Sequence, residues 1–148
     1  MKIVKKILLY LLVLLVLIQF YPMQKPKVNF KNPKDFLKNN NMPKEVAKIF
    51  KTSCYDCHSN ETKFPWYSKT APVKWLVYHD INEGREKLNF SEWNDLSDDD
   101  KSDKLFDIQD AVNDGEMPMK IYTFIHKNTR LTDKQRTLIS DFVENLAE

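Results

Sequence analysis

The chain has 148 residues, which is enough for one domain. Hydrophobic residues make up 42% of it and charged residues 30%, so the composition is that of a globular protein and not of a disordered one. It contains only two glycines and two cysteines, which excludes a multi-disulfide scaffold and argues against a β-rich fold with many tight hairpins.

The formal net charge of +2 is unevenly distributed along the chain. Residues 1–33 contain six lysines and no acidic residue, so the remaining 115 residues carry +2 minus 6, a net charge of −4. A mildly acidic body argues against a nucleic-acid partner bound through a basic face.

An unbroken apolar run, Ile7–Ile18, follows three lysines at the N-terminus. This pattern is typical of a secretory signal peptide or an uncleaved signal anchor. No small residue occurs in Gln19–Met23, where a cleavage site would lie, so the sequence favours the anchor, with a cleaved signal as the alternative. We expect a transmembrane helix over residues 1–22 and an extended tether over residues 23–33.

The rest of the chain, residues 34–148, is expected to be exported, because the positive-inside rule keeps the N-terminal lysines in the cytoplasm. We therefore expect one domain that faces the periplasm and is held to a bacterial inner membrane by the N-terminal helix. Apolar residues in this domain recur at helical spacing, and two of its segments begin after a proline. Pro43 opens a helix over Lys44–Thr52, and Pro72 opens a second helix that ends or bends near Gly84.

The remaining two predicted helices carry capping signals at their ends. Ser97 is an N-cap for a third helix, which ends at Gly115 in a left-handed cap. Thr132 and Gln135 form a capping box for the last helix. No segment alternates with the period of a strand, so we predict an all-α fold of four to five short helices joined by long loops.

The motif Cys54-Tyr55-Asp56-Cys57-His58 has the C-x-x-C-H spacing of covalent c-type haem attachment. The two thiols can add to the two vinyl groups on one edge of a porphyrin. His58, the next residue, is then held under the iron as its proximal ligand. We therefore expect one covalently bound haem c per chain, with iron as the metal.

The motif has three other possible interpretations. A redox dithiol is expected in a βαβ context, and no such context is visible in the sequence. A zinc site would need a second pair of ligands, which is missing. A plain disulfide is also possible in an exported protein, but the histidine that follows the motif favours haem.

Met117 is the first candidate for the sixth iron ligand, on the side opposite His58. It follows the third helix, and Pro118 after it favours an extended backbone that suits a loop residue pointing into a pocket. Met119, His79 and His126 remain alternative ligands.

Two further groups of residues are candidates for contacts with the porphyrin. Arg85 and Lys74 would pair with its propionates, although a solvated helix face is the favoured interpretation of both. Large aromatic side chains would line the ring or belong to an ordinary core. These are Trp66, Tyr67, Trp75 and Trp93.

In outline the sequence resembles a class I-type c-type cytochrome, which implies a cytochrome c-like helical bundle around one covalent haem. More narrowly, residues 45–146 resemble the single-haem haem-binding domain family of exported bacterial proteins. The matching motifs are Cys54–Thr62, Pro65-Trp66-Tyr67, Ala71-Pro72-Val73, Trp75-Leu76, His79, Glu83-Gly84-Arg85, Leu88–Trp93, Gly115-Glu116-Met117-Pro118, Tyr122 and His126. The resemblance implies His58 and Met117 as the axial ligands. The family often has a second proline where this chain has Met119.

These observations predict a membrane-anchored periplasmic electron carrier whose partners are redox proteins in or at the membrane. The alternative is a haem-based redox or gas sensor with a labile sixth ligand. We do not expect an enzyme, because the sequence has no obvious distal His–Arg pair of the kind a peroxidase uses.

Overall fold

The computed structural model describes residues 2–39 and 41–147, and these residues form helices and loops with no strand. The α-helices are α1 (Lys2–Leu17), α2 (Phe36–Asn39), α3 (Lys44–Ser53), α4 (Tyr55–His58), α5 (Val73–Lys87), α6 (Asp98–Asn113), α7 (Lys120–Ile125) and α8 (Asp133–Ala147). The 3-10 helices are η1 (Ile18–Phe20), η2 (Trp66–Lys69), η3 (Phe90–Asp95) and η4 (Lys127–Thr129). The all-α prediction is confirmed.

The four predicted domain helices correspond to α3, α5, α6 and α8, to which the structure adds the short α2, α4 and α7. The predicted caps are present. The Ser97 hydroxyl accepts a hydrogen bond from the Asp100 amide (3.1 Å), and the Thr132 hydroxyl accepts one from the Gln135 amide (3.3 Å). In contrast, α5 continues past Gly84, so the expectation that this glycine ends the helix is wrong.

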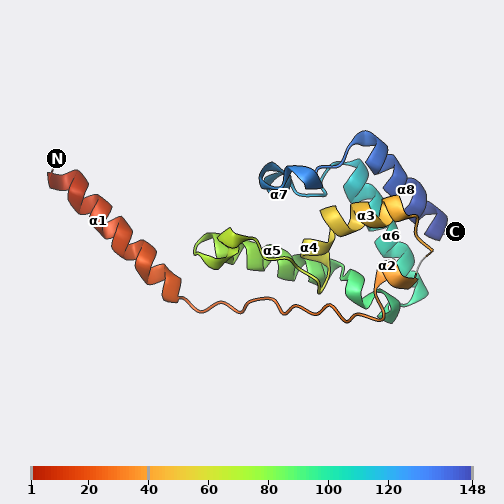
Figure 1. Ribbon diagram of the computed structural model, residues 1–148, viewed down its shortest axis with the longest axis horizontal. Helices are drawn as coiled ribbons and strands as arrows, with labels where there is room; N and C mark the ends of the chain where they lie inside the picture. The colour runs from red at the N-terminus through yellow and green to blue at the C-terminus, as the bar shows by residue number, and fades with distance from the viewer. Residues whose placement is uncertain (1, 40, 148) are drawn as a thin grey trace.

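The core lies where α6 and α8 pack along one another and against α3 (Figure 1). Its centre is aromatic. The Phe36 ring lies 5.3 Å from the Phe50 ring, 5.2 Å from the Phe90 ring and 4.7 Å from the Trp93 ring, centroid to centroid. Such edge-to-face and tilted pairs add to the stabilisation that burial alone gives.

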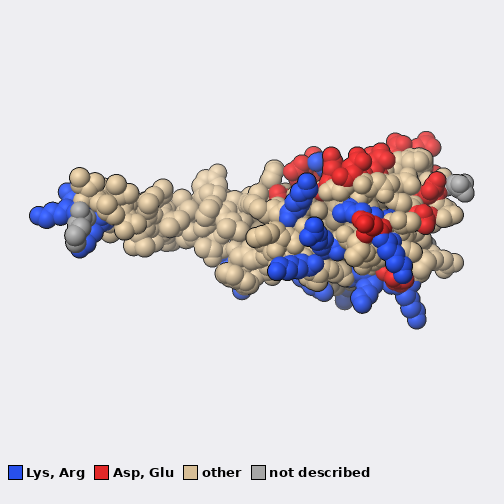
Figure 2. Space-filling view, turned by 90° about the horizontal axis from the view of Figure 1, so that it is seen from above, with Lys and Arg blue, Asp and Glu red and all other residues tan. Residues whose placement is uncertain are grey.

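Helix α1 stands apart from the domain (Figure 1). The helical stretch Lys2–Phe20 has a mean hydropathy of 2.4, and none of its most apolar window is buried inside the structure. Figure 2 shows it as a rod of uncharged residues with lysines at its free end. By length and composition this helix is able to cross a membrane, as the sequence predicted.

The segment after α1 has an extended backbone, and hydrogen bonds attach it to the domain. The Asn29 amide donates to the Asn60 carbonyl (2.7 Å), and Arg85 Nη1 donates to the Lys27 carbonyl (2.8 Å). The Lys25 ammonium lies 4.2 Å from the centre of the Phe64 ring. These contacts hold residues 23–33 along the domain, and we call this segment the strap.

Candidate functional site

The C-x-x-C-H motif begins where α3 ends and forms the short helix α4. The Cys57 and His58 amides both donate to the Cys54 carbonyl, at 3.2 and 3.0 Å. Residues three apart in a helical turn share a face, so this turn presents the two thiols on the same side. The sequence spacing alone therefore builds one half of the site.

The motif borders a cavity of about 400 Å³, a size typical of sites that hold a small molecule. Cys54, His58 and Met117 all line it. A smaller adjoining hollow of about 110 Å³ shares these three residues and adds Cys57. The wall of the larger cavity is mainly apolar and includes Phe50, Leu88, Phe90, Ile108, Val112 and Leu131. The fold thus brings all four predicted site residues together.

His58 is held in the state that a metal ligand requires. Its Nδ1 lies 3.1 Å from the Leu88 carbonyl oxygen. With the proton on Nδ1, this nitrogen donates to the carbonyl and leaves a lone pair on Nε2. Burial lowers the pKa of His58, which favours the neutral ring.

The two thiols are buried, and burial raises the pKa of both Cys54 and Cys57 to about 12. They are therefore protonated at neutral pH, unlike the low-pKa thiolates of redox C-x-x-C motifs. The part of the chain that the structure describes contains no group of three His, Cys, Asp or Glu side chains able to hold a metal ion. Neither the redox-dithiol nor the zinc interpretation gains support from this environment.

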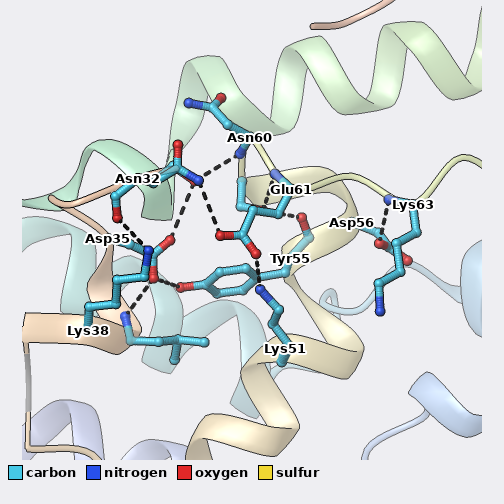
Figure 3. A network of polar contacts seen from close by, with 12 residues as sticks. Asn32, Asp35, Lys38, Lys51, Tyr55, Asp56, Asn60, Glu61 and Lys63 are labelled. Carbon is cyan, nitrogen blue, oxygen red and sulfur yellow. Dashed lines mark hydrogen bonds and ion pairs between the residues drawn. The ribbon is translucent and has the colours of Figure 1, made fainter. Parts of the chain in front are cut away.

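The two spacer residues of the motif anchor it to the surrounding protein (Figure 3). Tyr55 is 1% exposed, and its hydroxyl donates to Asp35 Oδ1 at 2.8 Å. On the other side, Asp56 accepts from the Lys63 amide at 3.1 Å and from the Tyr122 hydroxyl at 2.8 Å. The sequence does not predict these roles, because the motif does not reveal partners up to 66 residues away.

Gly84 lies at the point where α5 approaches the backbone of the motif closely. A Cβ atom at this position would lie 3.1 Å from the Cys57 carbonyl oxygen and 3.4 Å from its carbonyl carbon. Both are backbone atoms, which cannot turn aside as a side chain would. The absence of a side chain therefore lets α5 form one wall beside the cysteines.

Met117 owes its position to the end of α6. Gly115 has a φ of +72°, in the left-handed region that glycine favours, and it ends the helix as predicted. The chain then turns back, and the Met117 amide donates to the Ala111 carbonyl at 2.9 Å. Arg136 on α8 donates to the carbonyls of Val112 and Met117, the latter at 3.3 Å. The sequence analysis did not identify this arginine.

The alternative ligands occupy different positions. Met119 lines the smaller hollow but not the larger cavity. His79 is exposed on α5, with its Nε2 3.3 Å from a carboxylate oxygen of Glu83. His126 lies outside both spaces, with its Nε2 2.6 Å from the Tyr67 hydroxyl. Met119 and His126 both share a third hollow with Asp56 and Cys57 of the motif, but of the three alternatives only Met119 lines a space together with His58.

The predicted propionate partners are engaged elsewhere. Arg85 donates to the Ser59 carbonyl and to the Thr62 hydroxyl, both at 2.8 Å, and Lys74 donates to a carbonyl near the end of α1. The lysines that do line the larger cavity are Lys87 and Lys104. Their position follows from the packing of α5 and α6, which the sequence pattern does not reveal.

The tryptophans also lie away from the cavity. Trp93 is buried in the aromatic core, Trp66 is 83% exposed, and Trp75 packs edge-on against Tyr21 at 5.6 Å. Aromatic contact inside the cavity comes from Phe50 and Phe90. The core interpretation of Trp93 is therefore correct, and the prediction that tryptophans line the cavity is wrong.

Residues 13–145 match the family model described as the haem-binding domain, so the chain belongs to this family. No curated protein and no solved structure matches the chain. The residues of the cavity fit the group that the family name implies. They provide two neutral thiols on one helical turn, an imidazole whose Nδ1 faces a backbone carbonyl, a thioether, and an apolar wall.

Proposed function

We propose that this protein is a membrane-anchored periplasmic cytochrome that binds one haem covalently and transfers electrons without converting a substrate. The observation that carries this proposal is the meeting of Cys54, Cys57, His58 and Met117 at one largely apolar cavity. Two of these residues offer thiols for attachment. The other two are the axial pair of many cytochromes c.

The thiols of Cys54 and Cys57 would form the covalent link. Each thiol would add across one porphyrin vinyl group, with a carbon–sulfur bond formed and the thiol hydrogen passed to the second vinyl carbon. Because the adducts are thioethers and not disulfides, the attachment consumes no external oxidant. The helical turn of α4 keeps the two sulfur atoms on one side for this purpose.

His58 Nε2 and the Met117 sulfur would occupy the two ligand positions of the iron that the porphyrin leaves open. When bound, haem supplies an iron that changes between the ferric and ferrous states by one electron. The Leu88 carbonyl holds the His58 ring in one tautomer, and Arg136 holds the Met117 backbone. With both positions taken by protein ligands, electron transfer to partner redox proteins remains as the activity.

The anchor assignment rests on α1 and its three leading lysines. These lysines stay in the cytoplasm by the positive-inside rule, so the domain lies on the periplasmic side. This arrangement keeps the redox site close to membrane-bound donors and acceptors.

The test is a visible spectrum of the purified full chain in both oxidation states, together with haem-dependent staining of the denatured chain. We expect staining after denaturation, a reversible one-electron couple, and a thioether charge-transfer band in the ferric form. The absence of covalent haem or of the couple overturns the proposal. Rapid binding of carbon monoxide without that band supports the sensor instead.

A further inference from the structure

An apolar face lies on the surface of the domain next to the end of α1. We define it by six exposed side chains from η2, the start of α5, and α7: Trp66, Val73, Leu76, Ile121, Phe124 and Ile125. Trp66 and Phe124 are the most exposed, at 83% and 82%. Beyond Tyr21, the described residues include ten exposed large apolar side chains, and these six are the majority.

Four of the six side chains meet at one hollow, and η2 packs against α5. Val73 and Leu76 from α5 line the same shallow hollow as Ile121 and Ile125 from α7. Exposed apolar side chains scattered singly are ordinary, but a contiguous patch indicates a surface that another apolar phase or partner covers. The observation to explain is therefore what covers this patch.

The chain segments that carry the face are basic, although Asp56 and Asp80 also line the hollow that four of its side chains share. Residues 62–78 and 117–130, which carry the six side chains, contain no aspartate or glutamate. Their charged residues are Lys63, Lys69, Lys74, Lys120, Lys127 and Arg130. Apolar and aromatic side chains bordered by lysine are typical of surfaces that lie in the interface of an anionic membrane.

The residues directly after α1, in η1 and at Tyr21, are attached beside this face. The Gln19 side chain pairs with the Ala71 backbone, accepting from its amide at 2.9 Å and donating to its carbonyl at 3.1 Å. Lys74 donates to the Gln19 carbonyl at 3.2 Å, and the Tyr21 ring packs on Trp75. Figure 1 shows that the N-terminal end of α5 is the part of the helical domain nearest α1.

We propose that the apolar face lies in the interfacial layer of the same membrane that α1 spans, with Trp66 and Phe124 inserted at the boundary between headgroups and acyl chains. This inference rests on the proposed membrane anchoring. The two hydrogen bonds between the Gln19 side chain and the Ala71 backbone fix the face beside the point where α1 leaves the bilayer. Span and face together hold the domain in one orientation, so the site is kept at a fixed height above the membrane.

The test uses the full chain in nanodiscs of phosphatidylcholine with about 25% phosphatidylglycerol, since anionic lipid is the attracting partner. Phe124→p-benzoylphenylalanine places a photo-crosslinker on the face. Phe106→p-benzoylphenylalanine is the matched control, because Phe106 is 53% exposed but lies on the acidic α6. We expect position 124 to form at least about fivefold more lipid adducts than position 106.

A charge-reversal variant sharpens this test. Lys120→Glu with Lys127→Glu, combined with the crosslinker at position 124, is expected to lower lipid adducts at least about twofold in the anionic nanodiscs. It is expected to change them little in nanodiscs of phosphatidylcholine alone. Asp99→Lys with Asp103→Lys on α6 is the control and is expected to leave the adducts unchanged.

Three outcomes overturn the inference: equal lipid labelling at the two positions, crosslinks from position 124 to a second copy of the chain, or crosslinks from there to another protein. Resistance to carbonate extraction and the haem spectrum are measured on the same samples. Loss of the chain from the membrane contradicts the proposed anchoring. A retained, haem-loaded chain with no lipid adducts at position 124 contradicts only the interfacial face.

Discussion

The two sides of the cavity are built in different ways. On the side of His58, the cysteines and the histidine are consecutive parts of one helical turn, and Tyr55 and Asp56 anchor that turn from within the motif. On the other side, Met117 is set by the end of α6 and by Arg136 from α8. The difference teaches that one half of the site is fixed by local sequence and the other by long-range packing.

The largest effect is expected from replacing the two cysteines, which belong to the half of the site fixed by local sequence. Cys54→Ser with Cys57→Ser leaves no thiol for attachment, so we expect haem staining of the denatured full chain to disappear. Met117→Ala is the control and should retain full staining, because it leaves both thiols in place. Staining that persists in the double variant would contradict the covalent assignment.

Removing the long-range half is expected to change the spectrum without changing attachment. Met117→Ala should abolish the ferric thioether band, lower the reduction potential and open the site to carbon monoxide. Met119→Ala is the matched control, because Met119 lines only the smaller hollow. Loss of the band in the Met119 variant instead would assign the ligand to that residue.

A side chain placed at Gly84 tests how far the C-x-x-C-H turn depends on the close approach of α5. Gly84→Val places a side chain 3.1 Å from the Cys57 carbonyl oxygen, and we expect it to lower the free energy of unfolding by about 2 kcal/mol. Asn82→Val on the exposed surface of the same helix is the control. Thermal unfolding of both variants, followed by circular dichroism, measures the difference. Equal melting temperatures would show that the close approach is not needed.

The hydrogen bond that anchors the motif through Tyr55 can be removed with a single oxygen atom. Tyr55→Phe removes a hydroxyl that donates to the buried Asp35 carboxylate, and we expect it to cost about 1–3 kcal/mol of stability. Tyr122→Phe removes a comparable bond to Asp56, whose side chain is only partly buried, and should cost less. Denaturant titration of the two variants compares them, and the reverse order would contradict this account.

The smallest effect is expected at the positioning residue of the Met117 side. Arg136→Leu removes two hydrogen bonds to backbone carbonyls, which should cost about 1–2 kcal/mol and let the thioether leave the iron at a lower temperature. The readout is the temperature at which the ferric thioether band is lost, with covalent staining as a quantity that should not change. Arg130→Leu, at an exposed position, is the control. A band as heat-resistant in Arg136→Leu as in the control would assign Arg136 a purely structural role.

Much of the fold was predictable because its signals are local. Helical periodicity and the absence of strand patterning indicated the all-α class, and Ser97, Gly115 and Thr132 marked helix ends that the structure confirms. The motif likewise predicted two thiols on one side of a turn. Each of these signals depends on residues within a few positions of one another.

The sequence left alternatives open for residues whose partners are distant in the sequence. Arg85 was a candidate for a propionate, but the fold uses it to hold the strap and the loop after the motif. Trp93 was a candidate for the cavity wall, but its size made it a centre of the core. Residue type predicted an important role in both cases and could not predict the location.

The sequence by itself determined the apolar N-terminal helix, the all-helical domain and the C-x-x-C-H turn, because hydrophobic period, caps and spacing act over single helical turns. Only the tertiary structure decided that Gly84 lies against Cys57, that Arg136 holds Met117, and that η2, α5 and α7 form one apolar face beside α1. These relations depend on how helices pack, and packing is set by the joint shape of many side chains rather than by any local pattern.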